Sequence, residues 1–245
     1  MIAYLTSHIG GSYKISGKRI PTKLSTDNGF ADSLRKHWKD NANVLIISAD
    51  ADDIETNDSI MNIFVSSFPM SGLSIKRMDM CDKRNIHFAR ELADYDVVVL
   101  AGGHVPTQNL FFKEIQLKDC LQDFDGILIG ISAGSMNSAE VVYAQPELDG
   151  ESINKGYQRF FPGLGITKCM ILPHYQDTKD EMLDRKRLYE DITYPDSYGR
   201  EFYALVDGSY LLIEDDTTTL FGEAYLIKDG SIKQICKKDQ SICII

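Results

Sequence analysis

The stretch GILIGISAG, residues 126–134, decides the fold class of this chain. It begins as an apolar run without polar alternation, which is typical of a strand buried on both faces of a parallel sheet. It ends in Gly-Ile-Ser-Ala-Gly, which matches the Gly-x-Ser-x-Gly turn between such a strand and a helix. The two glycines allow strand and helix to approach closely. We therefore predict that Ser132 projects its hydroxyl above the carboxyl edge of a parallel sheet.

Similar apolar runs precede this stretch and alternate with helical patterns. The predicted strands cover residues 2–6, 43–49, 74–80 and 95–103. The predicted helices cover residues 30–39, 54–67, 85–93 and 108–121. Such alternation is typical of right-handed βαβ units. We therefore expect an α/β fold, a three-layer α/β/α sandwich with a mainly parallel sheet.

After Val142 the pattern changes. We expect an irregular region over residues 145–165, a strand over 169–175 and a charged surface helix over 178–191. From residue 201 the sequence predicts antiparallel strands with Asp-Gly turns at 207–208 and 229–230. We expect a single domain over residues 1–245, in which residues 215–245 form an appended C-terminal antiparallel hairpin and tail.

Composition excludes several classes of protein. The chain has 26 Lys and Arg against 36 Asp and Glu, a formal charge of −10, which argues against a nucleic-acid partner. Five cysteines without a Cys-x-x-Cys pair indicate free thiols in a reducing compartment. The N-terminus has no basic leader segment, and no apolar run approaches the ~20 residues that cross a bilayer. We expect a cytoplasmic protein without a membrane partner.

A serine nucleophile needs a base, and histidine suits this role because its ordinary pKa is about 6.5. His174 is the only histidine after Ser132, and it ends an apolar strand at the same predicted sheet edge. The N–H of Ala133 and that of Gly103, which follows another buried strand, are the predicted oxyanion donors. We expect His104 to line the substrate pocket. Neither metal-ligand spacing nor a nucleotide-binding motif is present, so we expect no metal and no cofactor.

Several of these features together resemble one family. They are an opening strand ending in Leu-Thr-Ser, the Gly102-Gly103 turn before a helix with Asn109-Leu110, the Gly-Ile-Ser-Ala-Gly-Ser elbow, and a strand ending in Pro-His. This combination resembles the dipeptidase E and cyanophycinase family of serine peptidases, which has the fold of class I glutamine amidotransferases. The resemblance implies hydrolysis of short peptides, with Ser132 as nucleophile, His174 as general base, and the N–H groups of Gly103 and Ala133 as oxyanion hole.

Two residues are candidates for the third member of the triad. Asp207, in Ala-Leu-Val-Asp-Gly, occupies the place of an acidic segment that family members carry after the histidine. Glu147 follows the serine by fifteen residues, where related peptidases also have an acidic residue. Either carboxylate could fix the tautomer of the imidazole. We favour Asp207 and retain Glu147 as the alternative acid.

Substrate preference is less well defined by the sequence. Dipeptidase E relatives cleave after an N-terminal aspartate, which requires a cation in the pocket, and carry an Arg-x-x-Arg pattern after the histidine. Here one alignment places Asp184 at the first of these arginines. Arg187 is our predicted substrate-binding residue, and Arg159 and Arg185 are further candidates.

The sequence is also compatible with two other functions and with assembly into a homodimer. An esterase of the α/β-hydrolase type needs an acid between serine and histidine, for which the chain offers Glu140, Glu147, Asp149 and Glu151. A non-catalytic amidotransferase-like domain would bind a small molecule or a partner and would lack a competent third triad residue. The strands predicted at 220–227 and 231–236 and the apolar end 242–245 could pair within the chain or with a second copy, which leaves a homodimer open.

Overall fold

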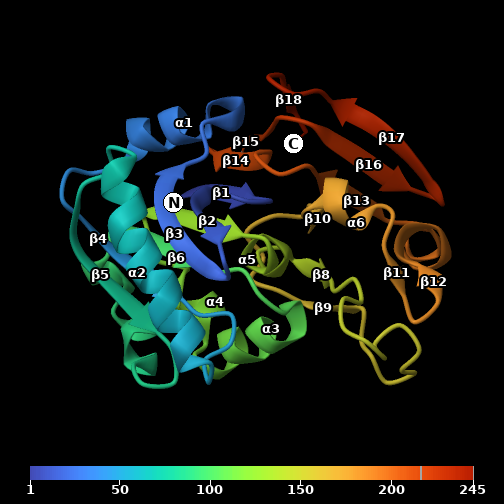
Figure 1. Cartoon of the computed structure of the whole chain (residues 1–245), viewed down its shortest axis with the longest axis horizontal. Coiled ribbons are helices and arrows are strands. Elements are labelled where there is room, and N and C mark those ends of the chain that lie inside the picture. Colours follow the sequence, from blue (N-terminus) through green and yellow to red (C-terminus); the bar gives the residue numbers. More distant parts are fainter. Residues whose placement is uncertain (216, 245) are drawn as a thin grey trace.

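The computed structural model describes residues 1–215 and 217–244, and an eight-stranded sheet forms its centre (Figure 1). The strand order is β18-β15-β14-β1-β7-β6-β4-β5. Neighbouring strands are parallel from β1 to β5, which are β1 (Ile2–Thr6), β7 (Ile127–Ile131), β6 (Val97–Leu100), β4 (Ala42–Ile47) and β5 (Ile75–Cys81). The antiparallel strands β14 (Tyr210–Glu214), β15 (Thr217–Phe221) and β18 (Ser241–Cys243) extend the sheet beyond β1.

Helices cover both faces of this sheet. On one face lie α1 (Phe30–His37) and α2 (Ile54–Met70), and on the other lie α3 (Val105–Glu114), α4 (Leu117–Cys120) and two 3₁₀ turns, η2 (Ile86–Arg90) and η3 (Leu92–Asp94). Alternate residues of β6 enter the two cores, because successive side chains of a strand point to opposite faces. The predicted three-layer α/β/α fold with a mainly parallel sheet is confirmed.

The predicted helices differ from the structure in detail. The stretch expected as a helix over 85–93 forms η2 and η3 instead. The helix expected over 108–121 starts at Val105, where Pro106 suits the first turn, and it is broken at Gln116, whose φ is 56°. A positive φ at a glutamine has no clear sequence signature, because the residues enriched in this conformation besides glycine are Asn, Asp and His.

A second sheet lies beside the first and holds the C-terminal strands. Its order is β10 (Met170–Leu172), β13 (Glu201–Leu205), β16 (Ala224–Lys228) and β17 (Ser231–Cys236). Leu5 and Leu211 of the first sheet pack with Leu205 and Ala224 of the second in one apolar cluster. The segment after residue 215 is therefore not appended as a separate hairpin, because its strands belong to both sheets. Of the apolar end 242–245, Ile245 lies outside the described residues.

Two Asp-Gly pairs have different roles. Asp229-Gly230 closes the β16–β17 hairpin, as predicted. Asp207-Gly208 joins β13 to β14, which belong to different sheets, so it is a crossover between sheets and not a hairpin turn. This crossover places Asp207 at the edge where both sheets meet.

The charged helix predicted over 178–191 is wrong. The structure has α6 (Tyr175–Thr178), a small hairpin of β11 (Met182–Leu183) and β12 (Lys186–Arg187), and a π-helix η4 (Leu188–Thr193) followed by α7 (Tyr194–Asp196). Asp184 and Arg185 form the turn with φ values of 51° and 65°. The Asp184 carboxylate accepts hydrogen bonds from the N–H groups of Gly150 and Ser152, and these bonds hold the turn against the neighbouring loop.

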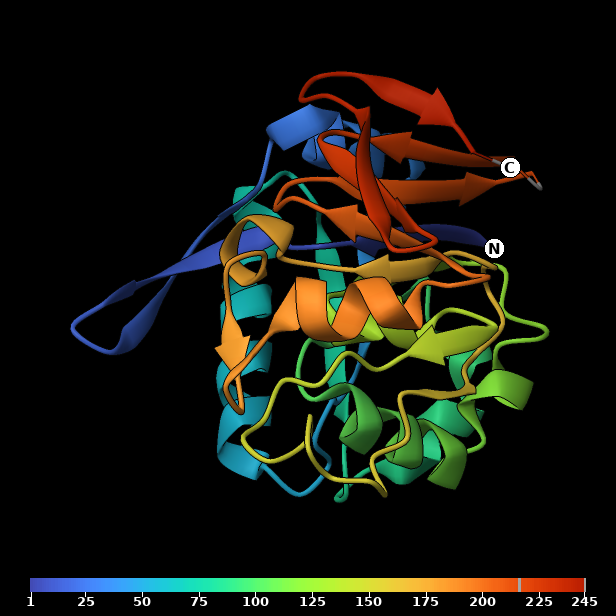
Figure 2. The ribbon, with the colours of Figure 1, turned by 90° about the vertical axis from the view of Figure 1, so that its right-hand side faces the viewer.

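A hairpin near the N-terminus was not predicted. It consists of β2 (Gly10–Ile15) and β3 (Lys18–Leu24), and Figure 2 shows it projecting from the body of the molecule. Its two-residue loop, Ser16-Gly17, has positive φ at both positions, as a tight hairpin turn requires. The remaining short elements are η1 (Asp27–Gly29), α5 (Ala133–Asn137), β8 (Val141–Tyr143) and β9 (Phe160–Pro162). No helix within the described ranges has the length and apolar character needed to span a membrane.

Candidate active site

Ser132 lies in the turn between β7 and α5, at the carboxyl edge of the parallel strands. Its φ of 50° and ψ of −110° are sparsely populated for a residue with a Cβ atom. The glycines beside it are needed for packing: a Cβ on Gly134 would lie 2.4 Å from the carbonyl oxygen of Leu100, and one on Gly130 would lie 3.0 Å from the backbone of Ser135. The Ser132 N–H donates to the carbonyl oxygen of Thr6 at 3.0 Å. The structure therefore has the strained strand-to-helix turn that the motif predicts.

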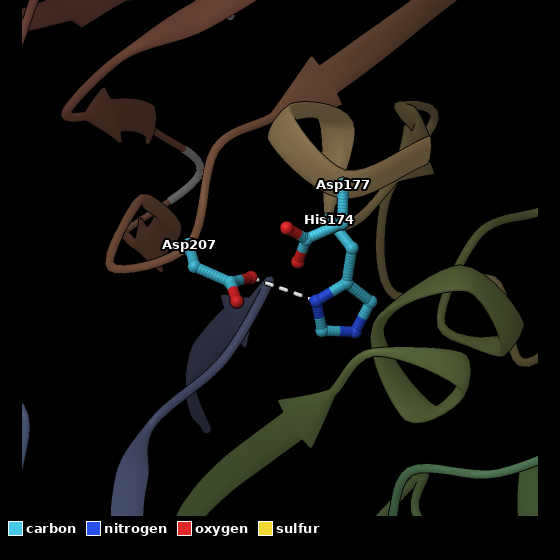
Figure 3. A group of neighbouring side chains, drawn as sticks. All are labelled: His174, Asp177 and Asp207. Carbon is cyan, nitrogen blue, oxygen red and sulfur yellow. Dashed lines mark hydrogen bonds and ion pairs between the residues drawn. The ribbon is translucent and has the colours of Figure 1, made fainter. Parts of the chain in front are cut away.

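His174 approaches Ser132 from the second sheet. It follows β10 and precedes α6 with a φ of 58°. Its Nε2 atom lies 3.0 Å from Ser132 Oγ, and its Nδ1 atom lies 2.7 Å from Asp207 Oδ1. The second of these hydrogen bonds is drawn in Figure 3. Serine, histidine and aspartate thus form one continuous chain of hydrogen bonds.

The Asp207 carboxylate is held in its ionised form. Partial burial acts to raise its pKa, but the hydrogen bonds from His174 and Ser7 outweigh this effect, and the pKa lies below its usual value. The Asp207 N–H donates to Gln176 Oε1 at 3.0 Å, which fixes the backbone of this residue. An ionised carboxylate in this position accepts a hydrogen bond from the Nδ1–H group of His174, which keeps the proton on Nδ1 and leaves Nε2 free to accept a proton from Ser132.

Ser7 is a site residue to which the sequence analysis assigned no role. It follows β1, is fully buried, and donates its hydroxyl proton to Asp207 Oδ1 at 2.7 Å. The same Oγ accepts from the backbone N–H of His174 at 2.8 Å. Ser7 therefore connects the histidine and the aspartate, which are far from it in sequence. Its only signal was the Leu-Thr-Ser end of the first strand.

The two predicted oxyanion donors are free to bind a ligand. In the described part of the chain, neither the N–H of Gly103 nor that of Ala133 donates a hydrogen bond to protein. A Cβ on Gly102 would lie 3.4 Å from Ser132 Cβ, so this turn runs directly beside the nucleophile. A Cβ on Gly103 would lie 2.5 Å from Ala49 Cβ, so a residue with a side chain does not fit at position 103 without a shift of the backbone.

A cavity of about 380 Å³ opens next to Ser132 and His174. The Gly102-Gly103 turn forms part of its lining. The β2–β3 hairpin contributes Ser12 and Arg19, and the Arg19 Nη1 atom donates to Ser12 Oγ at 3.3 Å. The cavity therefore combines the candidate nucleophile with a segment that the sequence analysis did not place.

His104 and Glu147 lie close to the triad without joining it. The His104 ring is hydrogen-bonded to Glu151 at 2.8 Å and to Thr107 at 2.7 Å, and His104 is not among the described residues that line the cavity. The Glu147 carboxylate accepts from the N–H of Val105 at 3.3 Å, and burial raises its pKa. Of the two candidate acids, the one hydrogen-bonded to His174 is Asp207. The structure thus differs from the expectation that His104 lines the pocket.

The predicted substrate-binding arginine lies elsewhere. The Arg187 guanidinium is exposed and forms an ion pair with Asp191 at 2.7 Å. Arg159 pairs in a similar way with Asp196 at 2.8 Å. Within the described ranges Arg187 does not line the cavity beside Ser132, where the arginine is Arg19. The predicted helix is a hairpin and a π-helix, so the spacing from which Arg187 was chosen does not hold.

His174, Asp177 and Asp207 are also close enough to be considered as metal ligands, with one ligand atom of each within 4.8 Å of the others (Figure 3). A metal ion on the Nδ1 atom of His174 would replace its hydrogen bond to Asp207. Asp177 meanwhile accepts a hydrogen bond from Gln176 at 2.8 Å. The donor set is therefore more consistent with an oriented histidine than with a metal site.

Comparisons with known proteins identify the family and the fold of the chain. The model of peptidase family S51 matches residues 17–221. A search of the curated proteins finds no match. Among solved structures, a peptidase from an acI-B1 Actinobacterium is 16% identical with a TM-score of 0.62, over 99% of this chain and 96% of that chain. A putative peptidase E protein from Listeria monocytogenes EGD-e is 14% identical with a TM-score of 0.56, over 96% and 98% of the two chains.

The structural neighbours share the fold, and the family model covers most of the chain. The resemblance that the sequence motifs indicated is confirmed by this match. The chain belongs to peptidase family S51 and is a serine peptidase.

Proposed function

We propose that this serine peptidase hydrolyses short peptides through a triad of Ser132, His174 and Asp207. The observation that carries the proposal is the continuous chain of hydrogen bonds, 3.0 Å from Ser132 Oγ to His174 Nε2 and 2.7 Å from His174 Nδ1 to Asp207 Oδ1. Nucleophile, base and orienting acid within hydrogen-bond reach are the arrangement that activates a serine hydroxyl.

The proposed mechanism has two stages. In the first, His174 Nε2 accepts the hydroxyl proton while Ser132 Oγ attacks the carbonyl carbon of the peptide bond, and the N–H groups of Gly103 and Ala133 bind the oxyanion. His174 then donates the proton to the leaving amine. In the second, His174 Nε2 accepts a proton from water as the water attacks the acyl-enzyme, and it returns this proton to Ser132 Oγ as the ester bond breaks and the peptide acid is released. Asp207 holds the imidazole in the required tautomer throughout.

Short peptides are the proposed substrates because the cavity beside the nucleophile is small. Its volume of about 380 Å³ lies near the lower end of the roughly 300–1,000 Å³ that is usual for ligand pockets. The Listeria neighbour is described as a putative peptidase E, which is consistent with this proposal.

The esterase alternative fits the site less well. An α/β-hydrolase acid stands between serine and histidine in the sequence. Here the acid that contacts His174 is Asp207, which follows the histidine. The proposed triad therefore has the order serine, histidine, acid. The non-catalytic alternative would lack an acid on the histidine, whereas Asp207 supplies one.

Ser132→Ala tests the proposed nucleophile. We expect loss of peptide hydrolysis and loss of labelling by a fluorophosphonate probe. Ser66→Ala is the matched control, because Ser66 lies on α2 and its hydroxyl donates to the carbonyl oxygen of Asn62. Undiminished labelling of Ser132→Ala, with the label mapped by mass spectrometry to another residue, would overturn the assignment.

A further inference from the structure

One wall of the cavity beside Ser132 and His174 is apolar. Ile60, Ile63 and Phe64 of α2 line it, together with Ile9 and Ile131. Residues three and four positions apart lie on the same side of a helix, so α2 presents these three side chains as one surface. A substrate held at Ser132 therefore has an apolar surface within its reach.

This apolar wall is rigid. Ile63 is 6% exposed and Phe64 is 8% exposed, and both belong to the core between α2 and the central sheet. The Phe64 ring stacks on Phe68 with 5.2 Å between centroids. Core packing fixes these two side chains in place. They therefore remain in the cavity wall, and no polar side chain can replace them there without repacking of the core.

Positive charge is sparse in the cavity. Arg19 is the one lysine or arginine among its described lining residues. Arg19 is exposed, and its guanidinium donates a hydrogen bond to Ser12. Burial lowers the pKa of the His8 imidazole, with His174 and Arg19 acting in the same direction against Asp207, and this favours the uncharged form of His8.

An acidic side chain in this cavity would lose hydration among Ile60, Ile63 and Phe64. Arg19 is exposed to solvent, so its attraction would offset only a small part of that loss. Burial of an unpaired carboxylate is strongly unfavourable. An apolar side chain would gain free energy there in proportion to the area removed from water. The cavity chemistry therefore selects apolar side chains over acidic ones.

We infer that the cavity binds an apolar side chain of the substrate, adjacent to the scissile bond, and that Ile60, Ile63 and Phe64 determine this preference. The inference rests on the proposed function, because it requires a peptide at Ser132. It assigns the substrate class as short peptides with a leucine-like or phenylalanine-like residue beside the bond that is cleaved. Arg19 is an exposed residue of the β2–β3 hairpin that borders this subsite, and it does not make the subsite a pocket for acidic side chains.

The test is a dipeptide series in which Leu, Phe, Asp or Lys occupies either side of the scissile bond. For wild-type enzyme we expect kcat/KM for Leu and Phe to exceed that for Asp by about tenfold or more on one side, the order expected for apolar discrimination. The side that shows the preference is the side that occupies the cavity. A wild-type preference for Asp would overturn the inference.

Variants of Ile60 test which residues set the preference. Ile60 is only partly buried, so a polar residue can be accommodated there more easily than at Ile63. Ile60→Asp should shift the Leu-to-Lys ratio of kcat/KM toward Lys, and Ile60→Lys should shift the Leu-to-Asp ratio toward Asp, each by about tenfold. Ratios are independent of the amount of folded enzyme, which fluorophosphonate labelling measures separately.

Val65→Asp is the matched control. Val65 lies on the same helix, is 47% exposed and is not among the described cavity residues. It should leave both ratios at the wild-type value. Equal shifts in Val65→Asp and Ile60→Asp, or no shift in either Ile60 variant, would overturn the inference. Absence of any Ser132-dependent peptide hydrolysis would instead overturn the proposed function.

Discussion

Ser132 and Asp207 reach the same site in different ways. The strand, the strained turn and the glycines that position Ser132 all lie within the nine residues 126–134, and one further hydrogen bond joins Ser132 to Thr6 on the neighbouring strand. Asp207 lies in a crossover between two sheets, and His174, Ser7 and Gln176 hold it. The position of Ser132 thus depends largely on local sequence, whereas the position of Asp207 depends on contacts between distant segments. Substitutions that alter only the segment around Ser132, or only the contacts of Asp207, can therefore show how much each contributes to activity and stability.

The largest expected effect concerns the acid. Asp207→Asn should reduce kcat by about 10³- to 10⁴-fold, because an amide can hold the imidazole in the wrong tautomer and cannot stabilise its cation. Glu147→Gln is the comparison, and its effect should be far smaller because Glu147 bonds to the N–H of Val105 and not to His174. Steady-state kinetics on one peptide measures both. A larger loss in Glu147→Gln would transfer the role of orienting acid to Glu147.

Ser7→Ala should have the next largest effect. The substitution removes a hydrogen bond to an ionised carboxylate, which is worth roughly 1.5–3 kcal/mol, and leaves the His174 N–H without its acceptor. We expect a reduction in kcat of about 10- to 100-fold with little change in KM, because Ser7 positions the triad and does not touch substrate. An unchanged kcat would show that Asp207 holds its place without Ser7.

Gly134→Ala tests the local arrangement around Ser132. The added Cβ would lie 2.4 Å from the carbonyl oxygen of Leu100, so strand and helix must separate. We expect a loss of about 1–3 kcal/mol in the free energy of unfolding, as for other overpacked sites. Thermal or urea denaturation measures it. Gly156→Ala is the control, since the atom nearest to its added Cβ is 3.3 Å away in the side chain of Asn154. Equal stability of the two variants would contradict the packing argument.

The smallest expected effect is a pH dependence of stability from Asp207. Its pKa is lowered in the folded state, so its ionised form stabilises the fold above the unfolded-state pKa of about 3.9. This contribution is lost as the pH falls through the folded-state pKa. The difference in unfolding free energy between wild type and Asp207→Asn should therefore shrink as the pH is lowered below about 4. Urea denaturation at pH 7 and near pH 3 measures it, and a constant difference would contradict it.

The sequence predicted the site best where short stretches decide the structure. The strands of the parallel sheet, the strained serine turn and the histidine after β10 all carry local patterns of apolar runs, glycines and a Pro-His end. The helix over 178–191 failed because charged residues are compatible with many exposed conformations, and two of them adopt positive φ in a hairpin turn. Arg187 was chosen from that helix and is paired with Asp191 instead.

By itself, the sequence predicted the α/β fold, the strained turn at Ser132 and the strand that ends in His174, because each follows from a regular apolar period or from a few consecutive residues. Only the tertiary structure decided that Asp207 and not Glu147 contacts His174, that Ser7 connects them, and that the β2–β3 hairpin brings Arg19 to a cavity walled by Ile60, Ile63 and Phe64. These contacts join residues far apart in the chain, so no local pattern encodes them, and they exist only after the two sheets and α2 have packed together.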